Sequence, residues 1–552
     1  MKALVWLVFA TVGLLSAWRF WLIGHTGISL YVDEAYYWGW AQNLAWGYYS
    51  KPPLVAWLIA ASTALFGNGV LGVKALAMLL YPATAGVLYV LGRDLFNERC
   101  GHALAQRVGL VAALLFASSF MVGLLGLFVS TDSLLVLCWA LAAWCWWRAA
   151  ASGRLGWWAA CGVVLGLGLL SKYTMAAFAA TALYSLWAHR SPSGHRLWRA
   201  PGPWIAAAVA LALFAPHLMW NWQNGMPTLR HTAEITATGL RSGGWASVAE
   251  FWAGQLLMLG PVPLMVVLGV GSGLLWARAL IPLRLHGYLL PLQHAGEGRG
   301  NGPGGGRALF PRAPHPVSLP DGRRGNTHPN NPIHYLLSLS VPLLAVTTAQ
   351  SFRAQSNLNW AAPAYVAISL LFAAWACGAL ANRSHPRWLG ITLAVNAVLV
   401  AFVCHATDIA RLIGQPLPKN TDAFVRMRGW HEALRMLQPI AAQHPGLPVL
   451  GVGRTLLAQT TYEWRGLGTR PVAWNPQGRA DDQYQLTTHL QPLLGKDVML
   501  VMQGPVPPDV AQRFESLDLL GNVTVGTAPN RQLAITLWRA RAFKGYAPLI
   551  SR

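Results

Sequence analysis

Long apolar stretches separated by short polar loops recur over the first three quarters of the chain. A membrane-spanning helix needs about 20 mostly apolar residues. Such runs lie at 3–24, 71–92, 108–129, 133–150, 157–171, 173–188, 203–220, 251–277, 335–349, 360–380 and 388–406. Only Lys2 precedes the first run, which lacks a small-residue cleavage site and is therefore expected to be a retained helix. The pattern predicts an all-α polytopic membrane protein with eleven spans, or up to thirteen because two runs are short.

The basic residues orient these spans. A further apolar run, Pro52 to Gly67, is short and is expected to lie at the interface. If it does not cross and the N-terminus is cytoplasmic, the Arg-rich loops alternate onto the inner side, as the positive-inside rule requires. These loops contain Arg93, Arg99, Arg107, Arg148, Arg154, Arg190, Arg196, Arg199, Arg278, Arg284, Arg383 and Arg387. The loops at 25–52, 130–132, 221–249 and 350–359 then face outward.

The last part of the chain has a different pattern. Residues 422–443 have helical periodicity, with Phe424, Met427, Trp430, Leu434 and Leu437 on one stripe. Short apolar runs at 448–452, 497–502 and 533–538 resemble strands between Pro/Gly turns. We therefore expect a transmembrane body over 1–407 and a small periplasmic α/β domain over 408–552.

One segment, 284–333, fits neither pattern. It is rich in Gly, Pro, Arg and His and has no core periodicity. It is either a disordered cytoplasmic loop or the product of a compensated frameshift in the gene, because a normal spanning pattern resumes at Tyr335. Its histidines lack the spacing of zinc ligands.

Composition supports the membrane interpretation. Hydrophobic residues make up 54% of the chain and charged residues 11%, less than half of the roughly 25% typical of soluble proteins. The formal net charge of +22 comes mostly from short loops between apolar runs. There it sets topology and meets anionic lipid, so nucleic acid is not an expected partner.

Polar residues near the span ends gather on the outer side of this topology. They are Asp33, Glu34, Lys51, Asp132, Lys172 and His217. Charged groups near a membrane mark a functional site by default. A carboxylate serves as a general base, and a lysine neutralises a phosphate leaving group. The alternative for Asp33 and Glu34 is a helix N-terminus, where acidic residues complement the dipole.

Five motifs in one order give a resemblance. They are DEAYYWGWAQNLAWGYYSKPPL at 33–54, STDSLLVLCWALAAW at 130–144, GLGLLSKYTMAAF at 166–178, PHLMWNWQNGMPTL at 216–229 and SNLNWAAPAY at 356–365. Together they resemble glycosyltransferase family 39, which includes protein O-mannosyltransferases and the aminoarabinose transferases of lipid A. The resemblance covers about residues 1–407 without 284–333.

This resemblance implies the GT-C membrane fold and an inverting transfer from a polyprenyl-phosphate sugar. Asp33 matches the catalytic base, Lys51 the lysine at the lipid phosphate, and Asp132 a second outer acid that positions substrate. Glu34 is implied to support the site or to bind the acceptor. Ser50 stands where many relatives have a carboxylate, so no cofactor is assigned and a divalent metal is left open.

Four further residues have two interpretations each. Lys172 contacts the phosphate or extends to the interface, and His217 is a site residue or a structural histidine. Asn359 binds sugar or anchors its helix, and Tyr36 lines a sugar pocket or belongs to the interfacial aromatic belt.

The sequence thus predicts a transferase of the bacterial inner membrane with a periplasmic site. Its partners are a polyprenyl-phosphate sugar, a glycolipid or protein acceptor with a hydroxyl or phosphate to modify, and membrane lipid. The alternative is a transporter or flippase for lipid-linked glycans, which would show internal repeats and charges at the bilayer midplane.

Overall fold

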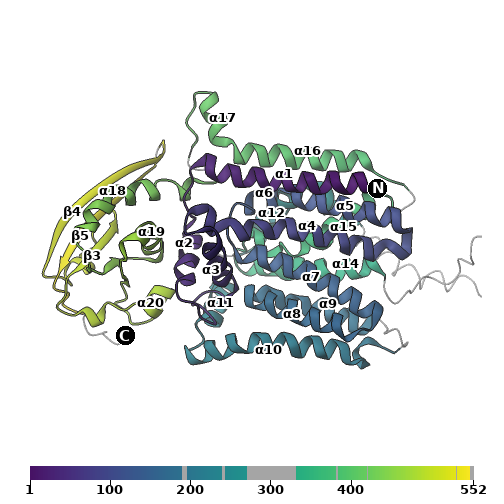
Figure 1. Ribbon diagram of the computed structural model, residues 1–552, viewed down its shortest axis with the longest axis horizontal. Coiled ribbons are helices and arrows are strands. Elements are labelled where there is room, and N and C mark those ends of the chain that lie inside the picture. Colours follow the sequence, from purple (N-terminus) through teal and green to yellow (C-terminus); the bar gives the residue numbers. More distant parts are fainter. Residues whose placement is uncertain are drawn as a thin grey trace, which may run out of the picture.

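A bundle of long helices and a small sheet domain at one end of it make up the molecule (Figure 1). This computed structural model describes residues 1–188, 195–238, 243–269, 331–380, 383–418, 421–529 and 531–546. Nearly all of the unusual segment 284–333 lies outside these residues, so neither interpretation of it is tested.

The helices of the bundle follow the predicted apolar runs. Within the described residues, six are long and apolar enough to cross a membrane: α1 (Lys2–Thr26), α4 (Val70–Cys100), α7 (Thr131–Ser152), α10 (Pro201–Gln223), α14 (Pro332–Arg353) and α16 (Pro386–Cys404). A seventh candidate is α12 (Trp245–Leu259), which continues as Pro261–Gly269 after a bend of 111°. Shorter apolar helices are α3 (Leu54–Phe66), α5 (His102–Ser118), α8 (Leu155–Ser171) and α15 (Ala364–Ala376). The chain is therefore a multi-pass membrane protein.

One predicted span is broken. The run 108–129 is divided between α5 and the short helix α6 (Phe120–Leu125). Ser119 between them is extended, and its hydroxyl accepts a hydrogen bond from the Val122 amide at 3.3 Å. This N-cap starts a new helix and ends the old one, which apolarity alone does not reveal.

The centre of the bundle is α15, where almost every side chain is buried. It packs against α14 and α5, while α4 lies along α5 and α7, and α8 lies between α7 and α10. The pair Tyr173–Ala177 (η1) and Phe178–Ala188 (α9) follows α8, and α9 contacts α14. Because these helices are packed tightly, the loops at their ends are held at fixed positions.

Short helices cover the end of the bundle that faces the sheet domain. They include α2 (Val32–Ala41), α3 and α11 (Pro227–Thr238) (Figure 1). The chain leaves the bundle through α16 and α17 (Ala406–Leu412) to enter the sheet domain.

The sheet domain occupies the described residues from 421 to 546. Its five strands are β1 (Val449–Gly451), β2 (Pro471–Ala473), β3 (Val498–Gln503), β4 (Ser516–Ala528) and β5 (Arg531–Arg541), in the order β2-β1-β3-β5-β4. The first three are parallel, and β5 is antiparallel to β3 and β4. The three predicted strands are confirmed, whereas β2 and β4 were not predicted.

The helices of this domain are α18 (Trp430–Ala442), α19 (Arg454–Glu463), α20 (Gln483–Thr487) and α21 (Pro508–Ala511). The first begins eight residues later than the periodicity indicated. Gly429 precedes it with a left-handed φ of 84°, which a helix interior does not accept. The five residues of the predicted stripe are nevertheless all buried.

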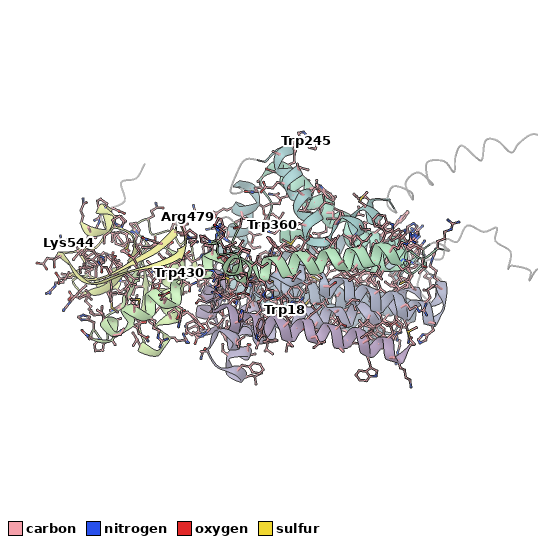
Figure 2. The ribbon with its side chains drawn as sticks, turned by 90° about the horizontal axis from the view of Figure 1, so that it is seen from above. Trp18, Trp245, Trp360, Trp430, Arg479 and Lys544 are labelled. Carbon is pink, nitrogen blue, oxygen red and sulfur yellow. The ribbon has the colours of Figure 1, made fainter. Side chains whose placement is uncertain are left out.

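The sheet domain and the first outer loop share one hydrophobic core. Side chains of α2 such as Tyr36 and Trp38 belong to the same buried cluster as Leu456 of α19 and Ile535 of β5. Figure 2 shows Trp360 and Arg479 near this junction, with Lys544 at the far end of the domain. The junction is therefore a packed interface.

Candidate active site

The first outer loop places two neighbouring carboxylates at the start of α2. Gly27 adopts a left-handed φ of 58° and ends α1. The Glu34 side chain then accepts a hydrogen bond from the amide of Tyr31, three residues before it, at 2.8 Å. This bond caps the N-terminus of α2. Asp33, in the first turn of α2, is 38% exposed, whereas Glu34 is 1% exposed. Two adjacent acids therefore face different surroundings.

A folded turn brings the chain back from α2 to Lys51. The Tyr48 ring stacks on Trp40 with centroids 4.6 Å apart. Its hydroxyl lies 3.1 Å from the Trp40 and Asn43 carbonyls and the Ala45 amide. The Tyr48 amide also donates to the Lys51 carbonyl at 3.2 Å. These bonds fix the backbone that carries Lys51.

Lys51 and Lys172 line one cavity of about 380 Å³. Ser50, Tyr173, His231 and Asn357 add polar atoms near the lysines. Ala177, Ile235, Leu343, Val346 and Trp360 supply apolar walls. The residues come from the first loop, η1, α11, α14 and the loop before α15. The cavity joins two cations to an apolar lining.

Asp132 and Lys172 form a buried pair beside Lys51. The Lys172 ammonium lies 2.6 Å from Asp132 Oδ1, and the Asn359 amide donates to Asp132 Oδ2 at 2.7 Å. Asp132 is in the first turn of α7, and Lys172 follows the last residue of α8. The predicted residues Asp132, Lys172 and Asn359 thus lie together.

The surroundings of Lys51 disfavour the charged form of its side chain. Burial, and then the charge of Lys172, lower the pKa of Lys51 to about 8, although Asp132 and Asp33 oppose this change. No ion pair of the described residues involves the Lys51 side chain. Lys51 is therefore a cation available to an anionic ligand.

Asp33 faces a cation from the sheet domain. The Arg454 guanidinium, at the start of α19, lies 3.2 Å from Asp33 Oδ1. The same guanidinium stands 5.1 Å from the centre of the Tyr36 ring. Both members of the ion pair are more than one-third exposed, so a substrate can reach them.

Glu34 does not fit the expected contact with substrate. Both of its oxygens lie 2.6 Å from the Lys74 ammonium, and Oε1 also accepts from the Val129 amide at 2.7 Å. Lys74 is fully buried and bonds to the Leu127 carbonyl at 3.0 Å as well. The Glu34 carboxylate therefore ties α2 to α4 and to the loop before α7.

Two other expected ligand contacts are also replaced by internal bonds. Tyr36 is fully buried, and its hydroxyl accepts from the Gln483 amide. His217 is fully buried between the Tyr173 hydroxyl at 2.6 Å and the Trp46 carbonyl at 2.7 Å. The geometry gives both residues structural partners and no exposed surface.

Sequence reasoning missed Lys74 and Arg454. A lysine in the middle of an apolar helix is a signal in itself, because a charge buried there needs a partner. Arg454 gave no such signal, since it lies more than 400 residues from Asp33 in an ordinary polar segment.

Comparisons with known proteins show similarity to membrane glycosyltransferases. Residues 50–220 match the family described as dolichyl-phosphate-mannose-protein mannosyltransferase. The lipid A galacturonosyltransferase RgtD of Rhizobium johnstonii is 28% identical over 481 residues, 85% of each chain. An undecaprenyl phosphate-α-4-amino-4-deoxy-L-arabinose arabinosyl transferase of Pseudomonas fluorescens is 29% identical over 150 residues, 26% of this chain and 25% of that one.

The fold has solved counterparts. ArnT of Cupriavidus metallidurans in the apo state superposes with a TM-score of 0.58 at 16% identity, covering 98% of both chains. ArnT bound to undecaprenyl phosphate gives the same TM-score and covers 97% of this chain and 98% of that one. This chain has the GT-C fold and is similar in sequence to glycosyltransferases of family 39.

The resemblance and the fold class predicted from the sequence are thus confirmed, and the chain is an enzyme. The transporter alternative finds no support among these family 39 relatives. Within the residues that the structure describes, no three His, Cys, Asp or Glu side chains gather as metal ligands. The metal therefore stays unassigned.

Proposed function

We propose that this GT-C enzyme of family 39 transfers a sugar from a polyprenyl phosphate to lipid A or a related glycolipid on the periplasmic face of the inner membrane. The observation that carries the proposal is the cavity shared by Lys51 and Lys172. The relatives support it, since they are named as a lipid A transferase and an undecaprenyl phosphate-sugar transferase.

The cavity suits a lipid phosphate. Lys51 and Lys172 lie at its polar part, and cations stabilise the charge that develops on a departing phosphate. Its lining on α14 runs from Leu343 to Gln350, about 10 Å along the helix. A polyprenyl chain would follow the apolar part toward the bilayer, with the sugar at the outer opening.

Asp33 is the general base in this proposal. Its carboxylate takes the proton of the acceptor hydroxyl, and the hydroxyl oxygen bonds to the anomeric carbon. The bond from that carbon to the phosphate oxygen breaks, and polyprenyl phosphate leaves with the electron pair. Lys51 stabilises the phosphate, and Asp132 holds Lys172 beside it.

The same geometry supports inversion at the anomeric carbon. A retaining reaction of the common type needs a second carboxylate as nucleophile. The Glu34 oxygens are bonded to Lys74, Tyr31 and Val129, and the Asp132 oxygens to Lys172 and Asn359. Of these three carboxylates, Asp33 is the one left to act as a base, and direct displacement then inverts the centre.

Mass spectrometry of a transfer reaction tests the proposal. Purified protein is incubated with lipid A and with undecaprenyl phosphate carrying galacturonic acid or 4-amino-4-deoxy-L-arabinose. One sugar mass should appear on lipid A with the wild type and be lost with Asp33→Asn. A folded wild type that binds undecaprenyl phosphate yet transfers neither sugar to lipid A would contradict the proposal.

A matched control separates chemistry from charge removal. Asp518 is 41% exposed and paired with Arg541, much as Asp33 is paired with Arg454, but it lies on β4 of the sheet domain. Asp518→Asn should transfer sugar at the wild-type rate.

A further inference from the structure

The sheet domain reaches into the site at one point. Arg454 is the first residue of α19, and its guanidinium contacts the Asp33 carboxylate of α2 at 3.2 Å. The motifs of the helical body do not include this residue, and the other charged residues of the site come from that body. The sheet domain therefore places a cation, Arg454, beside the proposed base.

The position of Arg454 depends on how its helix, α19, is held. The Gln459 amide donates to the Leu30 carbonyl at 2.9 Å, and the Ser29 hydroxyl donates to Glu463 at 2.9 Å. The Tyr462 hydroxyl donates to the Asn68 carbonyl at 3.1 Å. These bonds join the second half of α19 to the first outer loop and to the turn between α3 and α4. Because Arg454 is on the same helix, its position is coupled to that of Asp33.

A second segment of the same domain also contacts α2. The Gln483 amide donates to the Tyr36 hydroxyl, and Gln483 Oε1 accepts from the Tyr49 amide at 2.7 Å. Tyr36 is in turn the ring over which Arg454 lies, with its guanidinium 5.1 Å from the ring centre. The guanidinium is therefore restrained by a fixed aromatic surface as well as by its helix.

The contact leaves one carboxylate oxygen for chemistry. Arg454 approaches Oδ1 of Asp33 at 3.2 Å, and among the described residues no hydrogen bond reaches Oδ2. A general base must present one lone pair to the proton it takes, and a rotating carboxylate does so only part of the time. Holding one oxygen fixes the direction of the other.

We propose that Arg454 is a positioning residue through which the sheet domain completes the active site. It holds Asp33 Oδ1 so that Oδ2 faces the acceptor hydroxyl. This inference rests on the proposed function, in which Asp33 is the base. It assigns the sheet domain a part in the chemical step itself.

Steady-state kinetics of Arg454→Ala tests this inference with undecaprenyl phosphate-linked sugar and lipid A as substrates. The kcat should fall about 10- to 100-fold, because the carboxylate loses its fixed orientation, while both KM values stay unchanged. Arg454→Lys should recover part of the rate, and added methylguanidine should raise the kcat of Arg454→Ala. A purely structural role would not respond to methylguanidine.

Arg465→Ala is the matched control. This arginine follows α19 at its other end, where it stacks over the Tyr462 ring at 4.4 Å and bonds to the Tyr462 carbonyl. The Arg465→Ala substitution removes the same charge from the same domain, and this variant should keep the wild-type kcat. Equal thermal unfolding of both variants would show that the domain remains docked.

Two results would overturn the inference. One is a wild-type kcat in Arg454→Ala when Asp33→Asn is inactive, which leaves the proposed function standing and removes only the role of Arg454. The other is a raised acceptor KM with an unchanged kcat, which would make Arg454 a substrate contact. Failure of the proposed function would instead appear as full activity in Asp33→Asn.

Discussion

The surroundings of Asp33 and Glu34 form two contrasting regions of the molecule within one helical turn. Asp33 pairs with Arg454 where the sheet domain meets the outer loop, and both side chains are more than one-third exposed. Glu34 pairs with Lys74 inside the bundle, where both are essentially inaccessible. The Asp33 pair is open to substrate, whereas the Glu34 pair fixes the helix that carries Asp33.

The difference follows from helix geometry. Successive residues of a helix point about 100° apart, so neighbours in sequence face different partners. Glu34 points toward α4 and Val129, while Asp33 points toward α19. A pair of acids in a motif therefore does not imply a pair of acids in the chemistry.

Breaking the buried pair should have the largest effect on stability. Glu34→Gln leaves the Lys74 charge unpaired in the bundle, which is expected to destabilise the fold by about 3–5 kcal/mol. Thermal unfolding in detergent measures the loss. Replacing both partners, as Glu34→Gln with Lys74→Met, should restore much of it. A Glu34→Gln protein as stable as the wild type would contradict the buried ion pair.

Removing the Lys51 cation from the cavity should weaken use of the donor. Lys51→Ala is expected to reduce kcat/KM for the polyprenyl-phosphate donor about 100-fold, because the leaving phosphate loses a charged contact. The acceptor KM should change little. Initial rates with each substrate varied in turn give both values, and the reverse pattern would remove Lys51 from the phosphate site.

Much of the helical fold could be predicted from the sequence, but its details could not. The apolar runs predicted the helices of the bundle, because spanning segments must satisfy their backbone hydrogen bonds internally. They did not reveal the break at Ser119, where one hydroxyl starts a new helix. Strand β4 was not predicted because most of its side chains are only partly buried or exposed and lack a clean alternation.

The candidate site shows the same limit. Asp132, Lys172 and Asn359 could be singled out because each belongs to a motif, and they bond to one another in the structure. Their partners could not be inferred, since Asn359 lies 227 residues from Asp132. The pairing of Asp33 with Arg454 depends on how two domains dock, which no local pattern encodes.

Changing pH should affect donor binding through Lys51. Its ammonium is the charged form below its pKa of about 8, so affinity for undecaprenyl phosphate should fall as the pH rises through this value. The expected loss is about tenfold between pH 7 and pH 9. Lys51→Arg should bind equally well at both, because a guanidinium stays protonated. Equilibrium binding across this range tests the effect, and a flat wild-type profile would contradict it.

A small effect is expected where the sheet domain docks. Ser29→Ala removes the hydrogen bond to Glu463, which is nearly buried and also pairs with His431 at 2.8 Å. The loss should be about 1 kcal/mol in the free energy of unfolding, with the kcat unchanged. Denaturant unfolding and the transfer assay measure the two quantities, and a large fall in kcat would show that docking is less rigid than the contacts indicate.

The most direct test of the contrast between the two acids is the single-turnover transfer rate of Asp33→Asn and Glu34→Gln, each normalised to folded protein. The account predicts a loss of about 1,000-fold for Asp33→Asn, since the general base is gone, and no more than about tenfold for Glu34→Gln. Equal losses in the two variants, or a fully active Asp33→Asn, would contradict it.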